Sequence, residues 1–159
     1  MTNDDQNPFY LTQPARRAGS GALILNPDGH ILLVEPNYKP QWDCPGGIVE
    51  RGEDPRFACE REVREEIGLS NRTGRLLALA HYTDPLPRGD AIMFQYDCGV
   101  LDDPTQIQLQ TSELKSFQFV APDDLDQLTT ERLALRLRAA ILAQKTGKTI
   151  EIVNGKVIE

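Results

Sequence analysis

Residues 47–69 read GIVERGEDPRFACEREVREEIGL, and this stretch decides how the rest of the 159-residue sequence is interpreted. The segment 55–67 is predicted to form a helix of about three and a half turns. Pro55 suits the first turn of a helix, and Gly68 suits the position just past its end. A glycine-rich loop that ends in acidic residues precedes the helix.

Three glutamates lie on one face of the predicted helix. Glu62, Glu65 and Glu66 stand at i, i+3 and i+4, so at about 100° per residue they share an arc of roughly 100°. Val63 and Ile67 lie beside that arc and are expected to dock the helix on a sheet. Like charges at these spacings repel each other, and a solvated acidic face would tolerate the repulsion. The alternative to such a face is a cation site.

The surroundings of the acids favour the cation site. The acids gather on one face, whereas a salt-bridged helix surface intersperses both signs of charge. Pro45, Gly46 and Gly47 form a turn that could pass close to a ligand, and Glu53 can point to the same place from the loop. Four carboxylates that offer only oxygen are the ligands that Mg²⁺ or Mn²⁺ prefers. We therefore expect Mg²⁺, or Mn²⁺, as the cofactor.

The spacing of these residues resembles the Nudix box. Gly47 is followed after five residues by Glu53, and after seven more by Arg61-Glu62-Val63. One residue later comes Glu65-Glu66, and after one further residue Gly68-Leu69. Every fixed position of the box is filled, and its two apolar positions carry valine and leucine. The resemblance extends more loosely over residues 16–145.

The resemblance implies both a fold and an activity. The implied fold is of the α/β class, a Nudix-type αβα sandwich with a mixed β-sheet between two helical layers. The implied activity is metal-dependent hydrolysis of the pyrophosphate linkage in a nucleoside diphosphate joined to another moiety. In that reaction water attacks a phosphorus atom and a P–O bond of the diphosphate breaks.

The resemblance also implies roles for the box residues. The metal ligands would be Glu62, Glu65 and Glu66. Glu53 would assist the metal or the water, and the Gly47 backbone could offer a carbonyl to the metal. Arg61 would pair with a box carboxylate and hold the corner between the loop and the helix.

The general base is left open between two places. In that family it can be a box glutamate or a glutamate in a loop near the late strands. Glu113, in the segment TSELKSFQFV, matches the second place loosely, and Glu65 is the box alternative. Glu113 could also do no more than cap a turn.

Four side chains are candidates for contact with the substrate. Trp42 flanks the loop that enters the box and could stack on a base, or it could close the core beneath that loop. Tyr82 and Arg88 border the proline-rich loop 84–90. Arg17 precedes the first strand and could reach a phosphate, or it could simply be solvated.

The remaining elements are indicated by alternation, turn residues and helix caps. Strands are predicted on both sides of the box, at 16–26, 31–35, 75–83, 91–101 and 115–120. A second helix with one apolar stripe is predicted over 129–147, and Asn154-Gly155 predicts a hairpin. The chain is therefore divided into a flexible arm (1–15), the Nudix domain (16–147) and a β-hairpin tail (148–159).

Composition excludes other classes of protein. Seventeen Lys and Arg against 24 Asp and Glu give a net charge of −7, which argues against a nucleic-acid partner. No apolar run approaches the roughly 20 residues that a membrane span needs. Three cysteines without CxxC spacing are expected to be reduced thiols in a cytoplasmic protein. Dimers are common in the Nudix family, so a homodimer is left open, with residues 1–15 as an arm that could exchange between subunits.

Pro85 and the loop around it indicate which class of substrate to expect. The segment DPLPRGD separates two strands after the box, and its prolines would stiffen a loop above a cleft. Pro85 follows Leu69 by sixteen residues, which is similar to the pattern of Nudix enzymes that cleave ADP-ribose. We therefore expect a nucleotide-derived small molecule as the partner, with ADP-ribose or a nucleotide sugar as substrate. The alternatives are a nucleoside triphosphate, a dinucleoside polyphosphate, or a Nudix module that senses nucleotides without turnover.

Overall fold

The computed structural model describes residues 7–70 and 72–159. Its strands, within these residues, are β1 (Arg17–Leu25), β2 (Ile31–Pro36), β3 (Gly46–Ile48), β4 (Leu76–Tyr82), β5 (Ala91–Val100), β6 (Leu114–Val120), β7 (Ile150–Val153) and β8 (Lys156–Val157). Its α-helices are α1 (Pro8–Leu11), α2 (Pro55–Ile67), α3 (Leu125–Leu128) and α4 (Glu131–Thr146). Two short 3-10 helices span Pro104–Gln106 and Pro122–Asp124.

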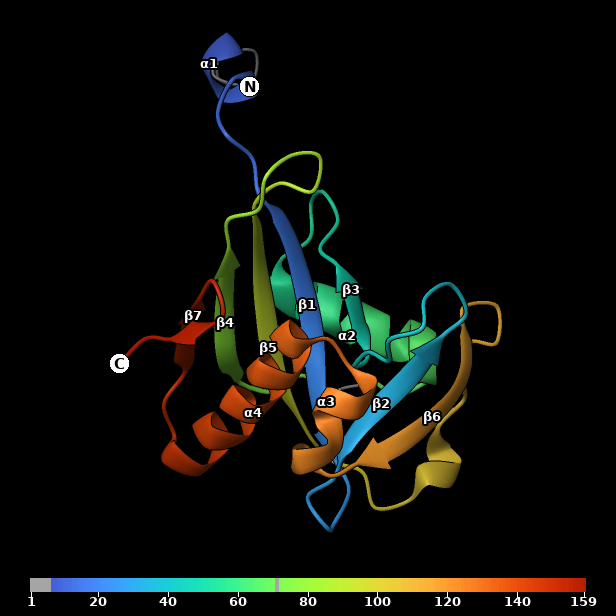
Figure 1. Cartoon of the computed structure of the whole chain (residues 1–159). Coiled ribbons are helices and arrows are strands. Elements are labelled where there is room, and N and C mark those ends of the chain that lie inside the picture. Colours follow the sequence, from blue (N-terminus) through green and yellow to red (C-terminus); the bar gives the residue numbers. More distant parts are fainter. Residues whose placement is uncertain (1–6, 71) are drawn as a thin grey trace.

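One mixed sheet lies between two helical layers. Its order is β6-β2-β1-β5-β4-β7-β8, and β3 pairs with β1 off this path. The pairs β1–β5 and β4–β7 are parallel, and the other pairs are antiparallel. Helix α2 covers one face of the sheet, and α4 covers the other (Figure 1). The predicted α/β sandwich is therefore confirmed.

Each face of the sheet has its own core because successive side chains of a strand point to opposite faces. On the α2 side, Val63 and Ile67 pack in one fully buried cluster with Ile24 of β1. On the α4 side, Leu137 packs in a second cluster with Leu23, the neighbouring residue of β1. The docking of α2 through Val63 and Ile67 agrees with the sequence prediction.

Local signals at the helix ends explain why the two long helices begin and end where predicted. The Asp54 side chain accepts a hydrogen bond from the Phe57 N–H at 2.8 Å, which caps α2. Thr130 caps α4 in the same way. Gly68 and Gly147 follow the two helices with φ of 73° and 74°, a left-handed conformation that glycine adopts without strain.

The glycine-rich loop before α2 contains a short strand that the sequence pattern does not indicate. Strand β3 pairs antiparallel with β1, and Ser20 lies opposite Gly47. The strand has three residues, two of them glycine, so it lacks the alternation by which strands are recognised. This pairing holds the start of the box against the centre of the sheet.

The C-terminal hairpin joins the sheet. Strand β7 runs parallel to β4, with Ile152 fully buried, and Asn154 and Gly155 form the turn to β8 with φ of 48° and 82°. Of the expected arm, residues 1–6 lie outside the described residues. The described part carries α1, whose three apolar side chains are exposed and which stands away from the sheet (Figure 1). Within the described residues, no helix is long and apolar enough to cross a membrane.

Candidate active site

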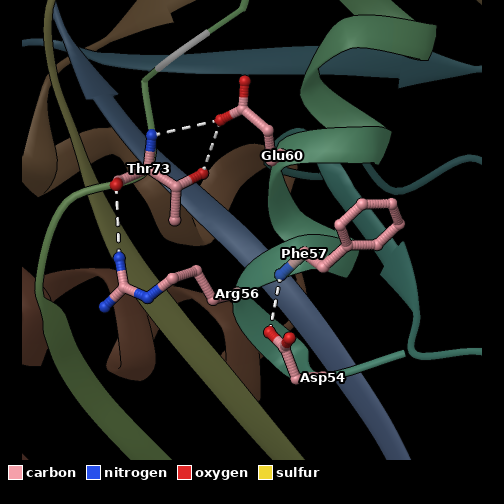
Figure 2. A pocket seen from close by; sticks show the side chains of 5 residues that line it. All are labelled: Asp54, Arg56, Phe57, Glu60 and Thr73. Atoms are coloured by element: carbon pink, nitrogen blue, oxygen red, sulfur yellow. Dashed lines mark hydrogen bonds between the residues drawn. The ribbon is translucent and has the colours of Figure 1, made fainter. Parts of the chain in front are cut away.

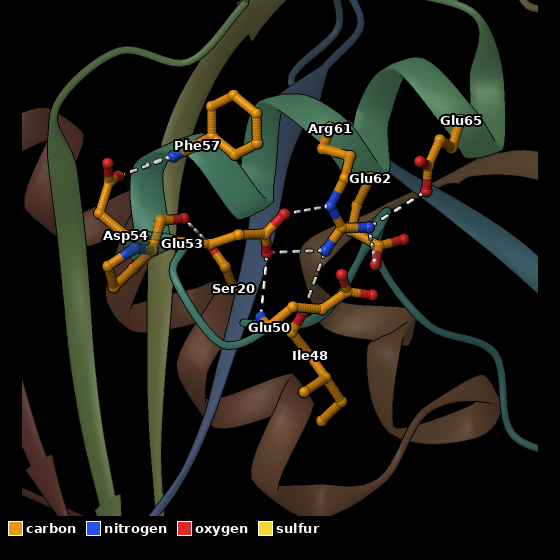
Figure 3. A network of polar contacts seen from close by, with 10 residues as sticks. Ser20, Ile48, Glu50, Glu53, Asp54, Phe57, Arg61, Glu62 and Glu65 are labelled. Atoms are coloured by element: carbon orange, nitrogen blue, oxygen red, sulfur yellow. Dashed lines mark hydrogen bonds and ion pairs between the residues drawn. The ribbon is translucent and has the colours of Figure 1, made fainter. Parts of the chain in front are cut away.

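Arg61 of α2 lies at the centre of a network of box carboxylates (Figure 3). Its Nε donates to Glu53 Oε1 at 2.6 Å, and its Nη2 donates to Glu53 Oε2 at 3.0 Å. Its Nη1 donates to Glu62 Oε1 at 2.8 Å and to Glu65 Oε2 at 3.1 Å. Nη2 also donates to the Ile48 carbonyl of β3 at 3.1 Å. Arg61 therefore ties β3, the loop and α2 together at one corner.

The charges of this network support one another. Hydrogen bonds from Arg61 hold the pKa of the Glu53 carboxyl below its usual range. The hydrogen bonds that Arg61 makes to Glu53, Glu62 and Glu65 in turn raise the pKa of Arg61. Glu53 also accepts the Glu50 N–H at 3.0 Å, which closes the turn before α2. Burial raises the pKa of Glu62 despite its contact with Arg61. Glu65 is about half exposed and lies at the rim.

Glu66 is the buried member of the acidic face, with 9% of its surface exposed. The Gly46 N–H donates to its Oε2 at 3.1 Å, and no other hydrogen bond reaches its carboxylate from the described residues. Burial raises the pKa of this carboxyl to about 8. A buried carboxylate that lacks a counter-charge is a natural position for a cation.

The residues present fit a hard divalent cation in their chemistry, because Glu62, Glu65 and Glu66 offer only carboxylate oxygens. Within the described residues, no three His, Cys, Asp or Glu side chains converge closely enough to hold an ion. Arg61 bridges two of these carboxylates instead, and its charge compensates their mutual repulsion. Gly47 leaves room for Glu62, since a Cβ at this position would overlap the Glu62 carboxylate.

Glu113 lies in the turn before β6, close enough to the box for its charge to act on two box carboxylates. Its negative charge contributes to the raised pKa values of Glu62 and Glu66. The turn is held by backbone groups: the Glu113 N–H donates to the Gln110 carbonyl, and its carbonyl accepts from the Asn37 N–H. Its side chain makes no hydrogen bond with the described residues, so this carboxylate does not cap the turn.

A cleft of about 300 Å³ opens beside β3, on the side of the sheet that α4 covers. Its walls come from β1, the loop before β3, the end of β4, the start of β5 and the first turns of α4. An adjoining lobe of about 220 Å³ shares Asp43, Ile48, Met93 and Arg136 with it and reaches Gly46 and Gly47 of the box. The cleft holds five cationic side chains, Arg17, Lys39, Arg88, Arg132 and Arg136.

Three of the four candidate substrate contacts line this cleft. Arg17 and Arg88 are exposed at its edge. Tyr82 is 3% exposed and carries the Arg132 guanidinium 4.4 Å from its ring centre, so it supports Arg132 and leaves little ring surface for a base. Trp42 does not line the cleft; it packs against the core on the α4 side, as the alternative interpretation of this residue expects.

The sequence interpretation missed the contribution of α4 to the cleft. Arg132 forms a two-pronged ion pair with Asp84, with both N···O distances at 2.8 Å. Arg136 is 6% exposed and donates through Nε to Gln95 Oε1 at 3.1 Å. A signal for Arg136 exists in the sequence, because it falls between Leu133 and Leu137 on the apolar stripe of the helix.

A hollow of about 420 Å³ beside the start of α2 is not part of this site (Figure 2). Its polar groups bond to one another: Glu60 accepts from the Thr73 hydroxyl at 2.9 Å, and Arg56 donates to the Thr73 carbonyl at 3.2 Å. The three proposed metal ligands do not line it. This hollow is therefore not the candidate active site.

Comparison with known proteins agrees with this architecture. The family model of the NUDIX domain matches residues 15–141, so the chain belongs to the Nudix family. An RNA pyrophosphohydrolase of Hydrogenovibrio crunogenus is 28% identical over 116 residues, which cover 64% of this chain and 70% of the relative. An ADP-ribose pyrophosphatase of Methanocaldococcus jannaschii is 36% identical over 81 residues, which are 49% of this chain and 48% of that one.

Among solved structures, a UDP-X diphosphatase superposes with a TM-score of 0.72 at 22% identity, covering 96% of this chain and 76% of that one. The likeness at that identity shows the shared fold. The chain is thus a Nudix pyrophosphohydrolase, and enzymes of this family act on nucleotide-derived small molecules and generally use divalent metals.

Proposed function

We propose that this chain hydrolyses the pyrophosphate linkage of a nucleoside diphosphate joined to another moiety, with Mg²⁺ as the cofactor and ADP-ribose or a nucleotide sugar as the substrate. The observation that supports this most is the cationic cleft, whose inner lobe reaches Gly46 and Gly47, the glycines that contact Glu66 and Glu62 of the box. A diphosphate is polyanionic, and an acidic protein binds it only where cations face it. The relative named ADP-ribose pyrophosphatase supports the same substrate class.

The proposed roles follow from burial and contacts. Glu62, Glu65 and Glu66 would hold the cation, which when bound neutralises the diphosphate and lowers the pKa of a bound water. Arg61 keeps Glu53 and the corner of the box in place. Glu113 would accept the proton of the attacking water, because its charge acts on Glu62 and Glu66 and its carboxylate makes no hydrogen bond to the described residues.

Replacing Gly47 by Ala should lower kcat/KM about tenfold. The new methyl group would displace the Glu62 carboxylate, and a small misplacement of a group that holds the reacting centre is costly. The loss should shrink as the Mg²⁺ concentration rises, since the proposed defect is in holding the cation. A titration of activity against Mg²⁺ measures this. A loss that is the same at every Mg²⁺ concentration would count against Glu62 as a ligand.

The substrate class is tested by comparing kcat/KM for ADP-ribose, UDP-sugars, nucleoside triphosphates and diadenosine polyphosphates at one Mg²⁺ concentration. We expect ADP-ribose or a nucleotide sugar to exceed every triphosphate. The loop 84–90 that carries Pro85 reaches the cleft through Asp84 and Arg88, so it can contact the second moiety. A tenfold higher kcat/KM for a triphosphate or a diadenosine polyphosphate would show that Pro85 does not indicate ADP-ribose or a nucleotide sugar as the substrate.

The relative named RNA pyrophosphohydrolase supports a second candidate, a pyrophosphate linkage on RNA. The net charge of −7 disfavours it, because long nucleic acids bind through basic surfaces. A homodimer and a cytoplasmic location stay predictions.

A further inference from the structure

Arg136 differs from the other cationic side chains of the cleft. Lys39 is paired with Asp43 at 2.6 Å, and both Arg132 and Arg88 are paired with Asp84. Arg17 forms no ion pair with the described residues either, but it is exposed to water. Arg136 forms no ion pair with the described residues, although it is the most buried of the five. A charge that is removed from water without a partner is destabilising, so this position calls for an additional partner.

The guanidinium of Arg136 is held from one side. Its Nε donates to Gln95 Oε1, and Gln95 is fully buried and fixed in turn by the Cys44 thiol at 3.7 Å. Its two terminal nitrogens make no hydrogen bond to the described residues, and the side chain lines both lobes of the cleft. The terminal nitrogens of this rigid, planar group are therefore available as donors to a ligand in the cleft.

Strand β1 has a glycine beside Gln95, and the missing side chain leaves room for the Gln95–Arg136 pair. Gly21 lies beside Gln95, and a Cβ at position 21 would lie 2.9 Å from Cys44 Sγ and 3.0 Å from Gln95 Oε1. A side chain there would displace the amide that orients Arg136. The small lobe in front of Arg136 is thus built around the Gln95–Arg136 pair.

We propose that Arg136 is the centre of an inner phosphate-binding subsite, with its two terminal nitrogens donating to two oxygens of one phosphate group. A guanidinium matches phosphate in charge and in two-pronged geometry, and hydrogen bonds between charged groups are strong in a buried position. This deepens the proposed function, on which it rests only for the identity of the substrate. The phosphate is either the one on the nucleoside or the one on the second moiety.

Binding is tested without catalysis, in EDTA, by the rise in Tm that inorganic phosphate causes relative to chloride at equal ionic strength. A ligand that binds the folded state raises Tm according to its concentration and affinity. We expect phosphate to stabilise the wild type, and R136M to lose at least about tenfold in apparent affinity. The matched control is R138M on the same helix, because Arg138 contacts Pro122 and Asp126 outside the cleft and should leave phosphate binding unchanged.

A second variant keeps the test decisive if R136M does not fold. R136K keeps the charge and loses the planar fork, so its apparent phosphate affinity should fall several-fold. Equal stabilisation of wild type and R136K, or of wild type and R136M, would overturn the subsite. A wild type that responds no more to phosphate than to chloride would also overturn it.

Two further probes distinguish the source of the phosphate. AMP and ribose 5-phosphate are tested in the same assay against adenosine and ribose. If R136K loses the rise in Tm that AMP causes, Arg136 binds the phosphate on the nucleoside. If R136K loses the rise in Tm that ribose 5-phosphate causes, Arg136 binds the phosphate on the second moiety. Phosphate binding that depends on Arg136 in a protein that hydrolyses none of the substrates would reject the proposed function alone. Hydrolysis with no phosphate effect would reject the subsite alone.

Discussion

Replacing Glu66 by Gln should lower kcat at least about a hundredfold while the fold stays intact. The substitution keeps the shape of the side chain and the acceptor for the Gly46 N–H, and it removes one ligand charge. A catalytic cation contributes several kcal/mol of transition-state stabilisation, which corresponds to rate factors of this size. Initial rates at saturating substrate and Mg²⁺ measure the effect. Glu131→Gln, on the exposed first turn of α4, is the matched control.

The same variant has a predicted effect on stability in EDTA. The pKa of Glu66 is raised by burial from its ordinary value of 4.5 to about 8, so the folded state favours the protonated form. Its contribution to stability is complete below pH 4.5 and is lost as the pH rises through 8. The Tm of the metal-free wild type should therefore fall relative to the Tm of E66Q between pH 6 and pH 8.5. Wild-type activity in E66Q, within a few-fold, would remove Glu66 from the proposed ligands.

Replacing Glu113 by Gln should lower kcat by about 10²–10⁴ and leave Mg²⁺ affinity nearly unchanged. The turn is held by backbone hydrogen bonds of residue 113, so we expect its Tm to change little. Because the negative charge of Glu113 contributes, after burial, to the raised pKa of Glu66, its removal should also lower the pKa of Glu66 in the metal-free protein. The measurements are kcat, the Mg²⁺ concentration at half-maximal activity, and Tm.

Two outcomes would show that Glu113 is not the general base. A loss of kcat below about fivefold would assign the base to a box glutamate, with Glu65 as the next candidate because it lies at the exposed rim of the network. A loss of kcat that higher Mg²⁺ restores would make Glu113 a contributor to cation binding. Comparing how the kcat values of E113Q and E66Q respond to Mg²⁺ then distinguishes a general base from a residue that binds the cation.

The helices and the layered fold could be predicted because their signals are local. Asp54, Pro55 and Gly68 mark the ends of α2 within its own sequence, and Thr130 and Gly147 do the same for α4. The apolar run of β1 is buried continuously along most of its length, which is typical of a strand with a core on each face of the sheet. Such features need no knowledge of what lies opposite in space.

The network and the cleft could not be predicted because they depend on contacts between distant segments. The pairing of β3 with β1 brings Ile48 within reach of Arg61, and a three-residue strand leaves no pattern of its own. Arg61 was expected to pair with a box carboxylate, but its contact with three of them follows from where the loop places Glu53. Arg136 stands out in the sequence as a cation on the apolar stripe of α4, but its partner Gln95 is 41 residues away, so the sequence does not indicate their contact.

Metal-dependent hydrolysis is tested most directly by following ADP-ribose by ³¹P NMR, with Mg²⁺ and with EDTA, for the wild type and E66Q. We expect the wild type with Mg²⁺ to convert ADP-ribose and one water into AMP and ribose 5-phosphate. We expect EDTA to abolish this conversion and E66Q to slow it at least about a hundredfold. Equal rates with Mg²⁺ and with EDTA, or equal rates for the wild type and E66Q, would contradict a metal-dependent centre on the acidic face of α2.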